Sequence, residues 1–469
     1  MPNTERFQVL AMGAANMVVM NLTIALSLST LVIAELHRPN AELAMDDTMA
    51  SWFGSLPFFC QPIGSLSSGF LVQWLGRRKS LMIINIPYTI GCLLICTAPS
   101  ITVLFLANIL LGTTIGFSEA PINNYFGEIC QPELRSTLAG SAAIFYQVGI
   151  FTLFVLGSLT SWRSTAGIVA IIPAVTMLML SRVPESPIWL VAQGRHKDAE
   201  AALCWLRGWV DRSAVQVEFR ELVKYYDNIT NKLARNVLKF VEIFKLLLEP
   251  ETLRPLFLTV SFFVLYAFGG YPSIRPFLVE VIESFHSPLK GTWSTVVMAT
   301  TGFVGSVMLV ASIHRLGKRS VSLASTGICA GSFLLLGLYA YLCITPSTPT
   351  GADTFLIPTW VPLVLFAVLS FANTIQGQMP WLLITEVFPY RTRGVAGGMA
   401  AGSVYFVCFI AAKTFLSTEH SMQLYGSFWL FGAINCFCFA FLYFLLPETE
   451  GKSLEEIESL FAGNKGRAK

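Results

Sequence analysis

Long apolar stretches separated by short polar turns make up most of the chain. Runs of about 20 residues, the length that a bilayer requires, occur at 8–34, 50–74, 81–98, 102–127, 136–158, 163–181, 254–283, 293–313, 320–344, 359–386, 394–416 and 422–446. Of all residues, 54% are hydrophobic and 13% are charged, whereas soluble domains carry about 25% charge. The pattern predicts an all-α membrane protein with twelve transmembrane helices in two six-helix halves.

A basic turn is repeated at corresponding places in the two halves. Gly76-Arg77-Arg78 follows the second apolar run, and Gly317-Lys318-Arg319 follows the eighth. Repetition over this distance indicates a duplicated architecture. Short loops rich in Lys and Arg lie on the cytoplasmic side, and an even number of crossings returns the chain to one side. We therefore expect both termini to be cytoplasmic.

One long polar interval, 182–253, separates the halves. It opens with Pro184-Glu185-Ser186-Pro187, in which Ser suits a helix N-cap and Pro suits the first turn. This predicts a helical cytoplasmic insert. A capping box at 453–456 predicts a short helix near the end of the chain. The expected domains are 1–181, 182–253, 254–446, and a C-terminal helix and tail at 447–469.

The composition argues against an enzyme, a metal-binding protein and a nucleic-acid-binding protein. The ten cysteines are scattered through apolar runs without metal-ligand spacing, so they are interpreted as small core residues. No nucleophile–base set and no metal set is present, so we expect no enzyme activity, no metal and no cofactor. The apolar composition excludes a nucleic-acid partner and implies the lipid bilayer as the surroundings.

Charged residues gather at the cytoplasmic ends of the fourth and tenth helices. Glu128 precedes Arg135 by seven residues, and Glu386 precedes Arg393 by the same spacing. Carboxylates at such a boundary can hold guanidinium groups through bidentate contacts. This predicts a gating network that breaks when the cytoplasmic side opens. Its expected members are Arg77, Arg78, Glu128, Arg135, Lys318, Arg319, Glu386 and Arg393. The alternative is ordinary boundary charge, since exposed ion pairs contribute little.

These motifs resemble those of the sugar porter family of the major facilitator superfamily. The matching pieces, in family order, are Gly76-Arg77-Arg78, Glu128 with Arg135, Pro184–Pro187 with Trp189, Gly317-Lys318-Arg319, Pro380-Trp381 with Glu386 and Arg393, and Pro447-Glu448-Thr449 with Gly451. The resemblance implies a major facilitator fold, two parallel halves around a central pathway, and transport of a sugar or polyol by alternating access. Two segments, 127–135 and 413–415, resemble insect facilitated trehalose transporters.

The chain departs from the family in its charge pattern. The acid that usually stands three residues before the Gly of the basic turn is replaced by Gln73 and His314, and Asn108 aligns with an Arg of the fourth helix. No acidic residue occurs between Glu5 and Glu35 in the first helix. The acid–base pair of proton-coupled relatives is therefore absent, and facilitative uniport is expected.

Several polar residues that contact sugar in the family are replaced in this chain. The family positions align with Tyr266, Ala267 and Pro272 on the seventh helix and with Val404 and Cys408 on the eleventh. Sugars need converging polar groups and an aromatic face. The residues expected to bind substrate are Trp381, Gln147, Gln376, Gln378, Asn373, Tyr266 and Arg275. Pro380 predicts a locally loosened tenth helix beside Trp381.

Two charges are expected inside the membrane, where an ionisable residue is a functional candidate. Glu119 lies in the fourth helix. Arg275 follows Gly269-Gly270-Tyr271-Pro272, which predicts a break in the seventh helix, and broken backbone is tolerated where it lines a cavity. The alternatives are that Glu119 only holds helices together and that Glu280 neutralises Arg275.

Three functions remain open from the sequence. The first is a plasma-membrane uniporter for a hexose, a trehalose-like sugar or a polyol, functional as a monomer. The second is a sensor or scaffold that has lost transport, suggested by the thinned polar site. The third is a proton-coupled or organic-acid carrier that uses Glu119 or Arg275. Uptake of several sugars with and without a pH gradient separates them.

Overall fold

The computed structural model describes residues 2–38, 41–129, 132–235, 247–344, 358–389, 392–452, 456–457 and 460–461. Within helices, the side chains at 2–5, 132–140, 225–235, 314, 385 and 393–394 are outside this description. Every regular element in the described ranges is helical. The expected all-α class is confirmed.

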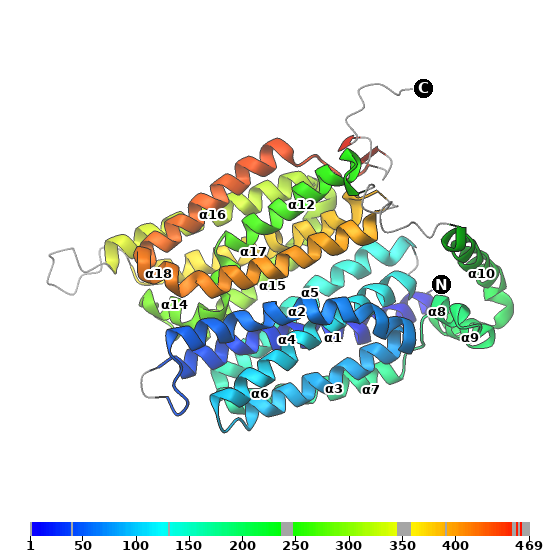
Figure 1. Ribbon diagram of the computed structural model, residues 1–469, viewed down its shortest axis with the longest axis horizontal. Helices are drawn as coiled ribbons and strands as arrows, with labels where there is room; N and C mark the ends of the chain where they lie inside the picture. Colours follow the sequence, from blue (N-terminus) through cyan, green and yellow to red (C-terminus); the bar gives the residue numbers. More distant parts are fainter. Residues whose placement is uncertain are drawn as a thin grey trace. The chain divides into compact units, whose positions relative to one another are not determined.

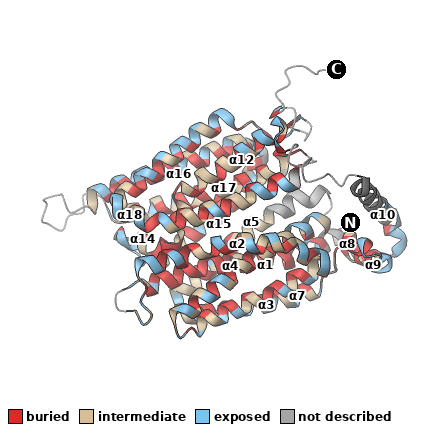
Figure 2. Ribbon diagram, viewed as in Figure 1, coloured by how far each residue is buried: buried red, intermediate tan, exposed pale blue. Residues whose placement is uncertain are grey.

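The first half contains helices at all six expected positions (Figure 1). They are α1 (Pro2–Leu36), α2 (Asp47–Leu75), α3 (Arg77–Cys96), α4 (Ile101–Ile129), α5 (Pro132–Leu159), and α6 (Trp162–Val169) with α7 (Ile171–Ser181). The sixth expected helix is thus divided at Ala170. Helix α1 is buried along most of its length (Figure 2), because other helices surround an apolar segment that has few charged positions.

The polar interval folds into helices α8 (Pro187–Ala192), α9 (His196–Leu206) and α10 (Arg212–Arg235). The hydroxyl of Ser186 accepts a hydrogen bond from the backbone N–H of Trp189, so Ser186 is the expected N-cap of α8. Trp189, Ala199 and Ala202 are buried together, and Phe219 of α10 packs against them. The described part of the insert is therefore helical with a small core of its own.

The second half consists of α12 (Pro250–Phe268), α13 (Tyr271–Ile274), the 3₁₀ turn η1 (Arg275–Phe277), α14 (Leu278–Ser284), α15 (Gly291–Leu316), α16 (Lys318–Cys343), α17 (Trp360–Val387) and α18 (Arg393–Leu445). The break expected after residue 268 is present. Helix α17 runs through Pro380 as one continuous helix. One other expectation is wrong in detail. The expected loop between 416 and 422 is helical, and α18 is interrupted at Gln423, whose φ is 59°.

The helices are long enough to cross a membrane twelve times. Ten helices in the described ranges meet length and hydropathy criteria for spanning. Helix α18 has 53 residues, enough for two crossings at about 20 residues each. Helix α2 is not among those ten, but its 29 residues are also enough for one crossing.

Contacts divide the chain into two compact units. The first unit contains 1–28, 60–153 and 160–239, and the second contains 29–59, 154–159 and 240–469. Chain order alone placed 29–59 in the first half. In the second unit these residues pack closely: a Cβ built at Gly54 would lie 2.6 Å from Cβ of Pro276. Glycine at this position allows the start of α2 to approach η1.

Candidate functional site

Arg77 and Glu128 form a bidentate ion pair in the first unit. Nε of Arg77 lies 2.8 Å from Oε2 of Glu128, and Nη2 lies 2.6 Å from Oε1. Both side chains are 15% exposed, so water screens the pair less than it would on an open surface. The hydroxyl of Ser186 also donates to Oε2 of Glu128. The expected pairing of Glu128 with the basic turn is confirmed.

Glu185 holds the same turn through its backbone. Its Oε1 accepts hydrogen bonds from the N–H groups of Arg77 and Arg78, each at 2.9 Å. These N–H groups belong to the first turn of α3, where a helix has no internal acceptors and where a negative charge is favourable. Gly76 precedes them with φ of 89°, a conformation that glycine adopts at low cost.

Arg78 reaches the end of α7. Its Nε lies 2.9 Å from the carbonyl oxygen of Leu180, and its Nη2 lies 2.8 Å from that of Ser181. Terminal carbonyls of a helix carry partial negative charge and lack intrahelical donors. Arg78 therefore ties the start of α3 to the end of α7.

The second unit has the corresponding cluster. Nζ of Lys318 lies 2.7 and 2.9 Å from the two carboxylate oxygens of Glu386, and 2.7 Å from Oε2 of Glu450. Thr449 donates to Oε2 of Glu386 at 3.1 Å. Lys318 is 9% exposed at its side chain, and a buried ammonium group needs such paired acceptors. The expected pairing of Glu386 with a loop cation is also confirmed.

Glu448 occupies the position that Glu185 has in the first unit. Its carboxylate accepts from the backbone N–H of Lys318 at 3.0 Å and from that of Arg319 at 3.1 Å. Gly317 has φ of 78°. Nη2 of Arg319 lies 2.7 Å from the carbonyl oxygen of Tyr443, near the end of α18. The duplication inferred from the turns therefore extends to Glu185 and Glu448 and to the helix-end carbonyls that Arg78 and Arg319 contact, while Glu450 is an additional partner in the second unit.

Sequence reasoning gave Glu185, Ser186, Glu448 and Thr449 no role in these clusters. The repeated tripeptides Pro184-Glu185-Ser186 and Pro447-Glu448-Thr449 were the signal that could have identified them. The contacts given above lie within one unit or the other. Two further expected members, Arg135 and Arg393, have side chains outside the described part of the chain.

The break between α12 and α13 is stabilised by polar side chains. Gly270 has φ of 106°, and a Cβ there would lie 2.5 Å from the ring of Phe431. Nδ2 of Asn435 donates to the carbonyl oxygen of Gly269 at 2.7 Å, and Oδ1 accepts from Nε2 of Gln376 at 3.1 Å. A backbone carbonyl without a hydrogen-bond donor in a membrane interior costs roughly several kcal/mol. Asn435, which sequence reasoning missed, supplies the donor for the Gly269 carbonyl.

Gln376, an expected sugar contact, is 2% exposed. Its amide donates to Asn435 and, at 3.3 Å, to Thr326. These bonds brace α16, α17 and α18 around the break. Asn373 is buried as well, whereas Gln378 is partly exposed.

Trp381 lies among aromatic side chains of neighbouring helices. Its ring packs edge-on against Phe263 of α12 with centroids 5.2 Å apart, and it lies 6.2 Å from the ring of Tyr405. Trp381 as a whole residue is 37% exposed. Tyr266 lies against the same helix, because a Cβ built at Gly377 would be 2.6 Å from its hydroxyl oxygen. The second unit thus brings Trp381 and Tyr266 to the facing sides of α17 and α12.

Arg275 lies in η1, directly beyond the break. Its carbonyl oxygen accepts a hydrogen bond from the hydroxyl of Thr30 at 3.0 Å, and its side chain is partly exposed. Glu280, the partner suggested for Arg275, contacts His37 at 3.1 Å.

The remaining expected residues belong to the first unit. Gln147 on α5 is 6% exposed. Two residues further along, α5 lies close against α1, because a Cβ built at Gly149 would be 2.0 Å from the hydroxyl oxygen of Thr23. Glu119 on α4 accepts a hydrogen bond from Ser65 of α2 at 2.7 Å. The bond to Ser65 agrees with the helix-holding alternative for Glu119.

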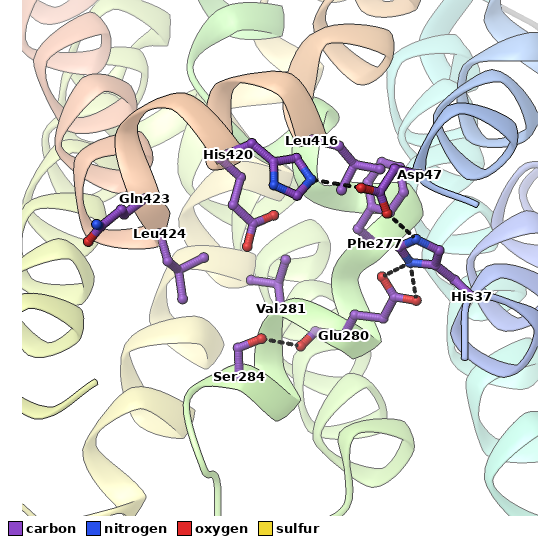
Figure 3. A pocket seen from close by; sticks show the side chains of 11 residues that line it. His37, Asp47, Phe277, Glu280, Val281, Ser284, Leu416, His420, Gln423 and Leu424 are labelled. Carbon is purple, nitrogen blue, oxygen red and sulfur yellow. Dashed lines mark hydrogen bonds and ion pairs between the residues drawn. The ribbon is translucent and has the colours of Figure 1, made fainter. Parts of the chain in front are cut away.

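A cavity of about 470 Å³ lies in the second unit, and neither Trp381 nor Tyr266 lines it; Figure 3 shows the side chains that do. Ionisable side chains on its wall are His37, Asp47, Glu280, Glu419 and His420. Among the described residues, no three His, Cys, Asp or Glu side chains converge as a metal site would require.

Comparison with known proteins identifies the family and the fold. The model of the family described as sugar (and other) transporter matches residues 16–461. The facilitated trehalose transporter of Polypedilum vanderplanki is 29% identical over 94% of this chain and 87% of its own length. That of Drosophila yakuba is also 29% identical, over 88% of this chain and 47% of its own length. The chain therefore spans about half the length of the Drosophila relatives.

Solved structures with the same fold include the xylose transporter XylE of E. coli. Its inward-open form has a TM-score of 0.74 at 17% identity, with 97% of this chain and 99% of that chain covered. The proton:xylose symporter XylE bound to 6-bromo-6-deoxy-D-glucose has a TM-score of 0.67 at 17% identity, with 98% and 99% covered. The expected major facilitator fold is confirmed.

Proposed function

Because the chain belongs to the sugar (and other) transporter family, we propose that it moves a hexose, a trehalose-like sugar or a similar polyol across a membrane by alternating access. The observation that carries this proposal is the duplicated charge cluster, built around Arg77 with Glu128 in one unit and around Lys318 with Glu386 in the other. Two equivalent units of this kind are what a rocking transporter requires.

We propose a plasma-membrane location with both termini and the 182–253 insert on the cytoplasmic side. The basic turns at Arg77-Arg78 and Lys318-Arg319 support this orientation. The functional domains would be 1–181, 182–253, 254–446 and 447–469, with one chain as the working unit. The clusters would then lie on the cytoplasmic side, where their partners change as that side opens and closes.

The substrate would bind beside the break between α12 and α13. Trp381 and Tyr266 provide aromatic surface on facing helices, and Gln378 and Arg275 are partly exposed polar groups in the same unit. Asn373 and Gln147 complete the proposed set. The Gln376 amide is already engaged by Thr326 and Asn435, so its part is to hold the break in place.

Uniport is favoured because the first helix has no acidic residue between Glu5 and Glu35. Proton coupling is the second candidate, and Glu119 is the residue that would support it. The sensor or scaffold alternative predicts binding of a sugar without its movement.

Uptake into proteoliposomes of radiolabelled trehalose, glucose and xylose tests these functions. Uniport predicts entry of at least one sugar down its gradient, with the same rate when the external pH is lowered. Accumulation driven by external acid, and lost in Glu119→Gln, would establish proton coupling instead. Sugar binding by the purified protein without uptake of any sugar would establish the sensor.

A further inference from the structure

His37 lies between two carboxylates on different helices. It follows the last residue of α1, and its Nδ1 is 3.1 Å from each carboxylate oxygen of Glu280 in α14. Its Nε2 is 2.8 Å from Oδ1 of Asp47, the first residue of α2. Figure 3 shows these contacts at the wall of the cavity. Both ring nitrogens therefore face an anion.

Asp47 connects this site to α18. Its second oxygen, Oδ2, lies 2.8 Å from Nε2 of His420. A continuous line of contacts runs from Glu280 through His37 and Asp47 to His420 (Figure 3). The line joins α14, α2, α18 and the residue that follows α1, although Glu280 follows His37 by 243 positions in the chain.

The geometry requires a protonated His37. A neutral imidazole has one N–H donor and one acceptor nitrogen, whereas an ionised carboxylate only accepts. With both nitrogens against carboxylates, the imidazolium can donate in both directions. After loss of the proton, one nitrogen lone pair would face a carboxylate oxygen, and that contact would become repulsive.

The surrounding charges favour the same protonation state. Arg38 is already shared between Glu35 at 3.9 Å and Glu283 at 3.5 Å. The ionisable groups around His37 on its own and neighbouring elements are Glu35, Arg38, Asp46, Asp47, Glu280, Glu283, Glu419 and His420. Six of these are carboxylates, so excess negative charge stabilises a proton on His37.

We propose that His37, Asp47, Glu280 and His420 form a proton-operated latch. The protonated latch holds the end of α1 and the start of α2 against α14 and α18, and loss of the His37 proton releases them. This assignment rests on the proposed function in one respect, namely that this side of the transporter is extracellular. External alkaline pH would then favour opening toward the outside, while neutral or mildly acidic pH keeps that side closed.

The titration has a defined direction. The hydrogen bond to Glu280 raises the pKa of His37 to about 9, with further contributions from the charge of Glu280 and from Asp47, while burial opposes the shift. In the released state, His37 would return toward its ordinary pKa of about 6.5. The stabilisation of the latched state is therefore complete below about pH 6.5 and disappears as pH rises through about 9.

Asp47 acts in the opposite direction at much lower pH. Its hydrogen bond to His37 lowers the pKa of its carboxyl group below the ordinary 3.8. That contribution is present above the ordinary pKa and is lost only as pH falls below it. Between pH 6.5 and 9 the response is consequently that of His37, with a ratio of latched to released protein that falls by up to about tenfold per pH unit.

Single-molecule fluorescence energy transfer in nanodiscs tests the latch without any sugar. The full chain would carry two dyes on azidophenylalanine introduced by Ala44→azidophenylalanine, before α2, and Ser421→azidophenylalanine, on α18. In the otherwise unchanged protein, the high-transfer population should decrease at least tenfold relative to the low-transfer population from pH 6.5 to pH 9. His37→Gln, which retains polarity without the charge, should abolish this dependence.

Two further variants make the result specific. Glu280→Gln removes the main acceptor charge and should move the transition to lower pH by about one unit or more, which corresponds to loss of a charge-assisted bond. His286→Asn is the matched control, because it removes a histidine that does not line the cavity and because Asn tolerates its φ of 52°. His286→Asn should leave the transition unchanged.

Three results would overturn the latch: a population that does not depend on pH, a high-transfer population that grows with pH, or a dependence that survives in His37→Gln. The sugar-uptake experiment reports on function separately. A pH-responsive distance in a protein that transports no sugar would refute the transporter and keep the latch. Sugar uptake with a pH-independent distance would refute the latch alone.

Discussion

The carboxylate of Glu185 lies against the bare Cα of Gly76. A Cβ at Gly76 would be 2.6 Å from Oε2 of Glu185, and in the second unit a Cβ at Gly317 would be 2.4 Å from Oε2 of Glu448. The absence of a side chain thus permits an acid to reach the first N–H groups of the following helix. Each basic turn therefore needs glycine for two reasons: the positive φ of the turn and the close contact with the glutamate carboxylate.

Gly76→Ala and Gly317→Ala are expected to destabilise the protein. Each would place a Cβ at positive φ, which costs about 1–3 kcal/mol, and would also displace the glutamate. We expect a lower Tm in detergent, measured by intrinsic fluorescence. Gly69→Ala is the control, since nothing lies within 4 Å of a Cβ there. An unchanged Tm in both turn variants would contradict the anchoring role of Glu185 and Glu448.

Neutralising the acid of either cluster should change the balance between inward-facing and outward-facing states. Glu128→Gln weakens the bidentate pair with Arg77, whereas in Glu386→Gln the Lys318 ammonium keeps Glu450. We therefore expect the larger change from Glu128→Gln, about tenfold in population or about 1.4 kcal/mol.

The labelling rate of a thiol introduced as Ser421→Cys measures this balance. The background would carry Cys436→Ser, because Cys436 is an exposed native thiol. Glu221→Gln, an exposed acid of the insert, is the control for loss of charge alone. Labelling rates that match the parent in both cluster variants would remove the gating interpretation and leave ordinary boundary charge.

Trp381→Ala and Arg275→Ala should each weaken sugar binding about tenfold, or about 1.4 kcal/mol. Trp381 would lose a stacking face, and Arg275 would lose a set of donors next to the helix break. Calorimetry with the purified variants measures the sugar affinity. Surface expression, measured in parallel, shows whether each variant still folds and inserts. Trp74→Ala is the matched aromatic control, because Trp74 is 83% exposed on α2. Parental affinity in both test variants would mean that the sugar binds elsewhere.

Asn435→Leu is expected to destabilise the break between α12 and α13. Leucine is close in size but removes the donor to the Gly269 carbonyl and leaves the Gln376 amide with Thr326 alone; a buried polar group without its partner costs about 1–3 kcal/mol. Thermal unfolding should begin at a lower temperature. Asn124→Leu, at an exposed position of α4, should have little effect. Equal Tm values for the two variants would show that the break does not depend on Asn435.

Several features of the fold could be predicted because their causes are local. The length of an apolar run determines whether it spans a bilayer, and most helix ends lie within a few residues of the expected positions. Glycines at 269 and 270 followed by Pro272 correctly predicted the break in α12. The polar residues at 417–421 indicated a loop, but the interval is helical and the chain departs from helical geometry at Gln423 instead.

By itself, the sequence determined the helical class, the number of crossings, the family, and Glu128 and Glu386 as acids that meet the basic turns. Only the tertiary structure decided that Gln376 braces a helix break with Asn435 and that His37 lies between Glu280 and Asp47. The physical reason is distance along the chain. Hydropathy and turn chemistry act over a few residues, whereas a polar side chain acquires its partner from whichever helix packs against it, and here that partner can be more than 200 residues away.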